Sequence, residues 1–291
     1  MLTEKRIAFV VNPISGRNKA IDMPALISQN LSNATPYDIL IWENASNFEE
    51  IRKQITSGKY SIVVAVGGDG TVNAVAQNLI NTGITLGIIP RGSGNGLARS
   101  LGIPQNTIKA IKRIETGTIR TIDSGMINEK PFFCAAGIGF DAHICQLFAQ
   151  TKKRGLSAYI KIGIQQFFSY KPKEYSIEVN NEVFKIKAFV VAFANAGQYG
   201  NDFYIAPQAK MDDGLLHIVI LKPFTFIGAC YLMVKILNRK AHLSKNILTL
   251  TAQSIKIKNL SIEPIHFDGE PGSLENEIEV SIHPQSLKVL C

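Results

Sequence analysis

Cysteine is scarce in this 291-residue sequence. Its four cysteines, Cys134, Cys145, Cys230 and Cys291, have neither the paired spacing of a disulfide framework nor the spacing of a metal site. This usage is typical of a reducing compartment, and we interpret all four as packing residues. We therefore expect a cytoplasmic protein.

Long hydrophobic runs are also missing. The N-terminal residues lack the apolar core and the small-residue cleavage site of a signal peptide, so we expect no secretion. The longest later apolar stretch, residues 224–237, is shorter than the roughly 20 residues of a membrane-spanning helix. We therefore expect no transmembrane segment.

Acidic residues are in the minority, with 23 Asp and Glu against 31 Lys and Arg and a formal net charge of +8. Such an excess favours an anionic partner, which leaves nucleotide, an anionic lipid surface and nucleic acid open. The sequence has no aromatic and basic sheet pattern and no DNA-reading helix motif, so we expect no nucleic-acid partner.

The pattern of apolar segments predicts two domains of different architecture. Up to about residue 125, strand-like stretches alternate with helix-like ones, which is typical of an α/β domain with a parallel sheet. From about residue 126 to 284, closely spaced strand-like stretches predict an antiparallel β-sandwich. No linker or internal repeat separates the two, so we expect the active site in the interdomain cleft.

The stretch AVGGDGTVNA, residues 65–74, is the most informative in the first half. Glycines after a buried strand let backbone N–H groups approach a phosphate, and the start of a helix adds a favourable partial positive charge. Asp69 is the exception, because a carboxylate repels phosphate unless it binds Mg²⁺ or accepts a proton. The alternative is that Asp69 caps the helix that begins near Thr71.

Two similar loops follow other strands of the predicted parallel sheet. One contains Ser93 between glycines in residues 92–96, and the other contains Ser15, Gly16 and Arg17. Loops that follow parallel strands meet at one edge of the sheet, so the three loops predict a shared phosphate site. No P-loop motif occurs, and residues 137–142 fit G-x-G-x-x-A without the acidic residue of a dinucleotide site.

Two carboxylate pairs stand beside glycine in the second half, Asp212 with Asp213 and Asp268 with Glu270. Such pairs commonly form turns, but a strand that runs into HFDGE can also present both acids at the edge of a cleft. The five histidines lack metal-ligand spacing, so we interpret them as structural.

Taken in order, the segments NPISG, VVAVGGDGTVNAVAQ, IPRGSGNGLAR, IDSGMIN, AAGIGFDA, IAPQAKMDDGLLHIVI and FDGE span nearly the whole chain. In this combination the sequence resembles the diacylglycerol kinase catalytic-domain family, which includes bacterial soluble lipid kinases and is similar to sphingosine kinases. The resemblance implies a nucleotide-binding domain over residues 1–125, completed by a C-terminal strand within 285–291, and a lipid-substrate β-sandwich over residues 126–284.

The resemblance also implies roles for individual residues. Asp69 would act with Mg²⁺, and Glu270 would accept the proton with Asp268 as its close partner, although the sequence leaves open which of these two acids takes it. A structural Mg²⁺ would be held by Asp213 and the backbone oxygens of Lys210 and Leu215. The residues expected to bind ATP are Asn12, Ser15, Gly16, Gly67, Gly68, Asp69, Gly70, Thr71, Asn73, Ser93, Gly94 and Asn95.

The resemblance implies an ATP-dependent lipid kinase that phosphorylates a hydroxyl of a membrane lipid such as diacylglycerol, a sphingoid base or a phosphatidylglycerol-like lipid. Residues 156–173 and 231–245 mix apolar, aromatic and basic residues as interfacial helices do, so we expect peripheral association with the inner face of the membrane. The alternative is that these helices pack on the sandwich. An NAD-kinase-like enzyme with a soluble acceptor, a non-catalytic binding module and a homodimer remain open.

Overall fold

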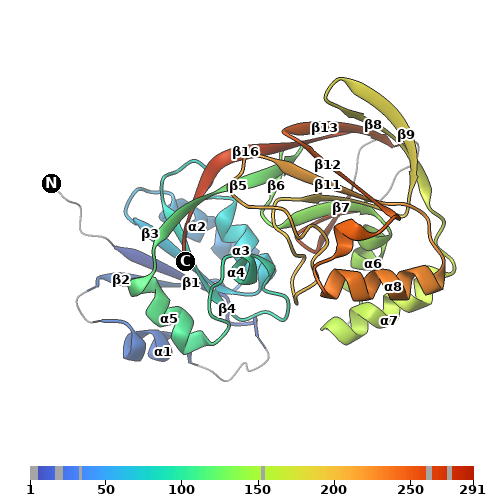
Figure 1. Cartoon of the computed structure of the whole chain (residues 1–291). Coiled ribbons are helices and arrows are strands. Elements are labelled where there is room, and N and C mark those ends of the chain that lie inside the picture. Colours follow the sequence, from blue (N-terminus) through green and yellow to red (C-terminus); the bar gives the residue numbers. More distant parts are fainter. Residues whose placement is uncertain (1–5, 17–21, 33–34, 152–154, 260–263, 274–276) are drawn as a thin grey trace. The chain divides into compact units, whose positions relative to one another are not determined.

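The computed structural model describes residues 6–16, 22–32, 35–151, 155–259, 264–273 and 277–291. The chain divides into two compact units, one formed by residues 1–122 with 285–291 and the other by residues 123–284. Figure 1 shows the elements of both units. Among the described residues, no helix combines the length and the apolar character that crossing a membrane requires.

The first unit is built on a parallel sheet, as the alternating sequence pattern predicts. The strands lie in the order β2, β1, β3, β4, and the end of β16 pairs in parallel with β4 through Lys288 and Thr85. The elements of this unit are β1 (Ile7–Val11), α1 (Met23–Asn30), β2 (Tyr37–Ile41), α2 (Ala45–Ile55), β3 (Ile62–Gly67), α3 (Asp69–Ala76), β4 (Thr85–Pro90), α4 (Gly96–Ser100) and α5 (Thr107–Thr116).

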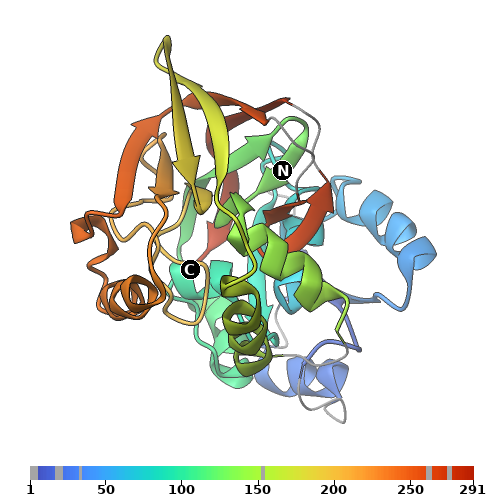
Figure 2. The same ribbon diagram turned by 90° about the vertical axis from the view of Figure 1, so that its right-hand side faces the viewer.

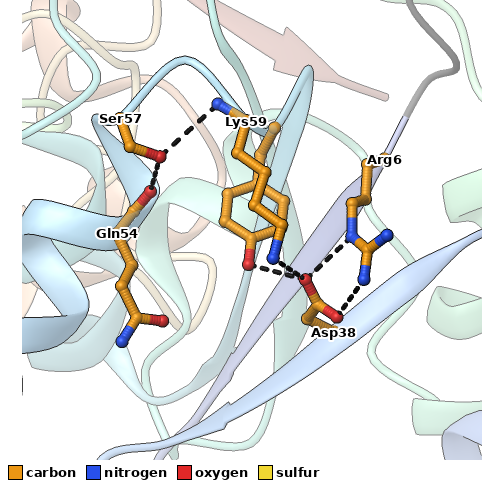
Figure 3. A network of polar contacts seen from close by, with 6 residues as sticks. Arg6, Asp38, Gln54, Ser57 and Lys59 are labelled. Atoms are coloured by element: carbon orange, nitrogen blue, oxygen red, sulfur yellow. Dashed lines mark hydrogen bonds and ion pairs between the residues drawn. The ribbon is translucent and has the colours of Figure 1, made fainter.

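A network of hydrogen bonds and ion pairs around Asp38 connects the outer strand β2 to neighbouring residues of the first unit. Asp38 on β2 accepts hydrogen bonds from Arg6 Nε at 2.9 Å, Arg6 Nη2 at 2.6 Å and the Tyr60 hydroxyl at 2.7 Å, and Lys59 Nζ lies 2.9 Å away (Figure 3). These donors, Arg6 foremost, hold the pKa of Asp38 well below its ordinary value. The sheet edge therefore has an electrostatic contribution that depends on pH.

The second unit contains a six-stranded antiparallel sheet, in the order β12, β11, β10, β7, β14, β15, and the antiparallel strands of the ten-stranded sheet to which β1 to β4 also belong. Its elements are β5 (Ile119–Ile127), β6 (Lys130–Phe132), β7 (Ala135–Gly139), α6 (Phe140–Ala149), α7 (Leu156–Phe167), β8 (Lys173–Val179), β9 (Glu182–Ala188), β10 (Val190–Ala194), β11 (Leu216–Leu221), α8 (Phe226–Leu237), the 3₁₀ turn η1 (Ala241–Leu243), β12 (Ile247–Ala252), β13 (Ser254–Asn259), β14 (Pro264–Phe267), β15 (Glu270–Ser273) and β16 (Glu277–Leu290). Strands β5 and β16 have residues in both units. The β8–β9 hairpin is yellow in Figure 2.

The side-chain alternation of the central strands explains why the second unit has two apolar cores. On β10, Val191 and Phe193 pack between the two sheets together with Tyr175 of β8. The intervening Val190 and Ala192 face the other way, into a second core that includes residues of α8. Strands buried on both faces read as continuous apolar runs, which is how residues 189–194 appear in the sequence.

Candidate functional site

The three glycine-containing loops of the first unit follow β1, β3 and β4, and we call them the first, second and third loop in that order. They lie together at the carboxyl edge of the parallel sheet. The Asn12 side chain, after β1, donates to Thr71 Oγ1 at the start of α3 at 3.0 Å. The Arg91 N–H, after β4, donates to the Gly67 carbonyl at 2.7 Å. The expectation that these strand ends share one edge is therefore confirmed by the geometry.

Close contact between two of the loops explains several of their glycines. A Cβ at Gly92 would lie 2.8 Å from the Gly68 Cα, and a Cβ at Gly94 would lie 2.8 Å from Asp69 Oδ2. A Cβ at Gly67 would lie 2.4 Å from that of Thr71. The glycines are therefore required by loop packing, independently of any ligand.

Asp69 joins the second loop to the third. Its carboxylate oxygens accept hydrogen bonds from the backbone N–H groups of Asn95 at 2.9 Å and Gly96 at 2.7 Å. The alternative that Asp69 caps its own helix is wrong, because Gly68 is the N-cap of α3 and makes no side-chain cap bond. The carboxylate instead caps the start of α4. Each oxygen keeps further lone-pair capacity for a metal ion or its waters.

Asn95 closes the third loop on itself. Asn95 adopts a left-handed backbone conformation with a φ of 50°, which asparagine tolerates well. The side chain accepts from Gly92 N–H at 2.8 Å and donates to the Gly92 carbonyl at 3.0 Å and to Gln105 Oε1 at 2.9 Å. These bonds occupy the side chain, so the loop's ligand-binding capacity lies in its backbone and in the exposed Ser93.

The first loop is a turn around Asn12. Asn12 Oδ1 accepts from Ile14 N–H at 3.1 Å, and the Ser15 hydroxyl donates to the Asn12 carbonyl at 2.8 Å. Gly16 has a φ of +100°, and a Cβ there would lie 3.0 Å from Arg91 Nε. Gly70 and Asn73 lie in the first turns of α3. Arg17 lies outside the described residues.

Arg91 is a site candidate that the sequence interpretation did not single out. Its guanidinium is partly buried beside Gly16, between the first and third loops, and this burial lowers the pKa of Arg91 from its ordinary value. Arginine remains protonated at neutral pH. The signal was present in the sequence, since Arg91 directly precedes Gly92 in the third loop.

In the second unit, the segment HFDGE forms a tight hairpin between β14 and β15. Asp268 and Gly269 have φ angles of 49° and 85°, the combination of a type I′ turn. The Asp268 carboxylate accepts backbone N–H groups from Phe133 at 2.7 Å, Cys134 at 2.7 Å and Ala135 at 2.9 Å.

Burial nevertheless raises the pKa of Asp268 to about 6, because the loss of water outweighs these three donors. Glu270, the first residue of β15, is exposed. The two acids of the motif thus occupy contrasting environments, and Asp268 anchors the hairpin to the start of β7.

Cys145 on α6 supports the same hairpin from the other side. Its thiol donates to the Gly269 carbonyl at 2.8 Å, and burial, with Asp141 and Glu270 nearby, raises the pKa of Cys145 to about 12. The thiol therefore stays protonated. The interpretation of the cysteines as packing residues holds for the buried Cys134 and Cys145, but it is wrong for Cys230, which is exposed.

Asp141, His266 and Tyr199 form a buried network that the sequence interpretation missed. Asp141 Oδ2 lies 3.1 Å from His266 Nε2 and accepts from the Tyr199 hydroxyl at 3.0 Å. Burial and the Asp141 charge raise the pKa of Tyr199 well above its ordinary value, so it remains a donor. A Cβ at Gly137 would lie 2.7 Å from Asp141 Oδ2, so the glycine allows the Asp141 carboxylate to lie against the backbone of β7. This contact explains the glycine at position 137 without a bound nucleotide.

The predicted structural metal site lies in the turn before β11. Asp213 Oδ1 accepts from Leu215 N–H at 3.0 Å, and Asp213 Oδ2 lies 3.2 Å from His217 Nε2. The buried Asp123 accepts from Gly214 N–H at 2.7 Å. Carboxylate and backbone carbonyl oxygens are ligand types that Mg²⁺ prefers, so the donor types of the predicted site suit this ion. Within the described residues, no cluster of three His, Cys, Asp or Glu side chains could hold a metal.

Comparison with known proteins gives two family matches. Residues 6–127 match the diacylglycerol kinase catalytic domain, and residues 134–291 match the YegS C-terminal NAD kinase beta sandwich-like domain. The three loops of the first unit lie within the first matched segment, and the hairpin of Asp268 and Glu270 lies within the second.

Individual relatives agree with these matches. The probable lipid kinase YegS-like protein of Enterobacter sp. (strain 638) is 30% identical over 84% of this chain and 83% of its own length. The diacylglycerol kinase of Bacillus subtilis (strain 168) is 28% identical over 93% of this chain and 91% of its own. A crystal structure of a diacylglycerol kinase from Bacillus anthracis str. Sterne shares the fold, with a TM-score of 0.73, 22% identity and coverage of 100% of this chain and 97% of that chain.

Proposed function

Because the chain belongs to the diacylglycerol kinase catalytic-domain family, we propose that it is an ATP-dependent lipid kinase that transfers the γ-phosphate to a hydroxyl of a membrane lipid. The observation that carries the proposal is the meeting of the three loops after β1, β3 and β4 at one sheet edge. Diacylglycerol, a sphingoid base and a phosphatidylglycerol-like lipid are the acceptor classes to be tested.

The loops of the first unit would bind the nucleotide. Backbone N–H groups of residues 67–71, 93 and 94 and the N-terminus of α3 offer donors and partial positive charge to phosphate oxygens, and Asn95 holds the shape of the third loop. Asn12, Ser15, Gly16 and Asn73 extend this surface, and the Arg91 cation adds charge. Bound Mg²⁺ would supply neutralisation of phosphate charge, with Asp69 as its carboxylate.

In this proposal the general base is the Glu270 carboxylate. It takes the proton of the lipid hydroxyl while the lipid oxygen forms its bond to the γ-phosphorus and the bond from phosphorus to the ADP oxygen breaks. The contrast between the two acids supports this assignment, because Asp268 already accepts three N–H groups and Glu270 is exposed. Asp268 is then a positioning residue that fixes the hairpin on which Glu270 stands.

The test is phosphate transfer from γ-labelled ATP to a panel of lipids in mixed micelles containing Mg²⁺. Glu270→Gln is expected to lower the rate by roughly 10²-fold to 10⁴-fold, the range for loss of a general base. Glu182→Gln, a change at an exposed position of β9, is the matched control and is expected to retain activity. Full activity of Glu270→Gln would contradict the assignment.

Asp213, with the carbonyl oxygens of Lys210 and Leu215, would bind a structural Mg²⁺, and Asp123 would support it through water. A ligand that binds only the folded state raises the melting temperature. Mg²⁺ is therefore expected to raise the Tm of the wild type and of Asp212→Asn but not of Asp213→Asn, measured by circular dichroism. An equal Mg²⁺ shift in all three proteins would contradict this site.

The NAD kinase beta sandwich-like match of residues 134–291 keeps a second function in view, in which the acceptor is soluble. The same labelled-ATP assay with NAD as acceptor decides between the two. If neither lipid nor NAD is phosphorylated, the third candidate is a non-catalytic binding module, for which Asp69→Ala would leave function intact in a complementation assay.

A further inference from the structure

Helix α8 presents an apolar face to solvent as well as to the core. Leu232 and Ile236 are buried against the second core of the unit. On the opposite side, Ile227 is 81% exposed, and Val234 and Leu237 are 57% and 56% exposed. Phe226, Cys230, Tyr231 and Met233 share this exposed side. A helix that is apolar all round is ordinarily buried on all sides.

Helix α7 continues this face. Ile160 and Ile164 are exposed at a spacing of four residues, and Phe168 follows four residues later just beyond the helix with 75% exposure. The Phe168 ring stacks on Phe226 of α8, with ring centres 5.2 Å apart and an interplanar angle of 29°. The Phe167 ring, at the end of α7, also lies against Phe226, with ring centres 5.5 Å apart, so the end of α7 meets the start of α8. We call Ile160, Ile164, Phe168, Ile227, Val234 and Leu237 the α7–α8 surface.

Exposed apolar side chains that gather on one face of a helix mark an interaction site, whereas singly scattered ones do not. The packing of α8 needs only Leu232 and Ile236, so the folded unit gives no reason for the outward apolar residues. The sequence alternative, that these helices pack on the sandwich, is correct for one face and leaves the other unexplained.

The charged residues in the sequence stretches that contain α7 and α8 are all basic. No Asp or Glu occurs in the sequence between Asp141 and Glu174 or between Asp213 and Glu263, the stretches that contain α7 and α8. Lys161 is exposed beside Ile160 on α7. Lys235 Nζ lies 4.9 Å from the centre of the Tyr231 ring, and Lys240 is exposed beyond the end of α8.

We propose that the α7–α8 surface docks the protein on an anionic lipid bilayer. Its aliphatic and aromatic side chains enter the interfacial region, and the surrounding lysines contact lipid phosphates. This inference rests on the proposed lipid kinase function, since it states how that enzyme reaches its substrate. A second copy of the chain is the poorer occupant, because two such surfaces in a symmetric contact would bring like charges together.

The first experiment measures co-sedimentation with vesicles of phosphatidylcholine alone or of equimolar phosphatidylcholine and phosphatidylglycerol. The wild type is expected to bind the anionic vesicles at least about tenfold more tightly, because several lysines lie near the surface. The double variant Ile227→Asp/Val234→Asp is expected to lose about tenfold or more of that binding, since it places charge at interfacial depth. Val183→Asp on β9, where Val183 is 65% exposed, is the matched control and should bind as the wild type does.

The second experiment uses the native Cys230, which lies on the exposed side of α8, whereas Cys134 and Cys145 are buried. In a Cys291→Ser background, an environment-sensitive fluorophore on Cys230 is expected to shift to the blue with anionic vesicles and to be quenched by spin-labelled lipid. This readout needs no substitution within the α7–α8 surface.

Neither readout requires turnover, so failure of docking and failure of the kinase assignment are distinguishable. Loss of vesicle binding in the double variant, with normal phosphorylation of a water-soluble short-chain diacylglycerol, would support both. Loss of vesicle binding without any lipid phosphorylation would support docking alone. Wild-type vesicle binding by the double variant, an unresponsive Cys230 probe, or a wild-type dimer that the double variant dissociates in sedimentation velocity would overturn the docking proposal.

Discussion

Replacing Asp69 by Asn separates its structural contribution from its proposed metal role. The carboxylate accepts two backbone N–H groups, from Asn95 and Gly96, at 2.9 and 2.7 Å. The Asn amide has one oxygen, so one of these donors would face an NH₂ group instead. Losing one hydrogen bond to a charged group costs about 1.5–3 kcal/mol. The other bond becomes neutral and about half as strong, which brings the expected loss to about 2–4 kcal/mol.

Urea unfolding followed by tryptophan fluorescence measures this loss of stability in the first unit, to which Asp69 and the tryptophan both belong. Trp42 is the only tryptophan, and it stacks on Phe48 of α2 with ring centres 4.1 Å apart. With an m-value of about 2 kcal/mol/M, the midpoint of Asp69→Asn should fall by about 1–2 M.

Asp22→Asn is the matched control, since Asp22 caps α1 and Asn caps equally well. Its midpoint should equal that of the wild type. An Asp69→Asn midpoint equal to both would refute the inference that Asp69 ties the second loop to the third.

Three further predictions concern stability. The pKa of Asp38 is lowered in the folded state, so its stabilisation, about 1 kcal/mol for a partly exposed network, is fully present above about pH 4 and is lost on acidification; the stability difference between wild type and Asp38→Asn should shrink as the pH falls. The pKa of Asp268 is raised to about 6, so stability should decline by about 2–3 kcal/mol as the pH rises from about 4 to 6 in the wild type but not in Asp268→Asn, measured by urea unfolding with circular dichroism. Gly92→Ala should cost about 1–3 kcal/mol because its Cβ would meet Gly68, whereas Gly163→Ala, in open space on α7, should gain about 0.5–1 kcal/mol; opposite signs in thermal melts would contradict both.

The architecture and the meeting of the three loops could be predicted from the sequence, because both follow from short-range patterns. Alternation of strand-like and helix-like segments predicts a parallel sheet, and the connection rules of such sheets bring the loops to one edge. The same reasoning identified Asp69 as unusual among glycines. It could not identify the partners of Asp69, because Asn95 and Gly96 lie 26 and 27 residues away in the sequence.

In the second unit, the features that could not be predicted from the sequence also depend on contacts between residues far apart in the chain. The apolar stretch of residues 182–196 suggests one strand, but the chain leaves one sheet after β9 and enters the other at β10. Asp268 and Glu270 look alike in sequence, and burial together with the N–H groups of residues 133–135 sets Asp268 apart from the exposed Glu270. The Asp141–His266 contact joins positions 125 residues apart.

Strand β16 has a consequence for synthesis of the protein on the ribosome. The first unit includes residues 285–291, whose Leu287 and Val289 are fully buried and whose Lys288 pairs with Thr85. When residues 1–122 have emerged, this strand has not yet been translated, so the edge of β4 that it covers is still bare. Exposed strand edges invite aggregation. The nascent first unit should therefore need protection, by a chaperone or by delayed folding, until the last strand is made.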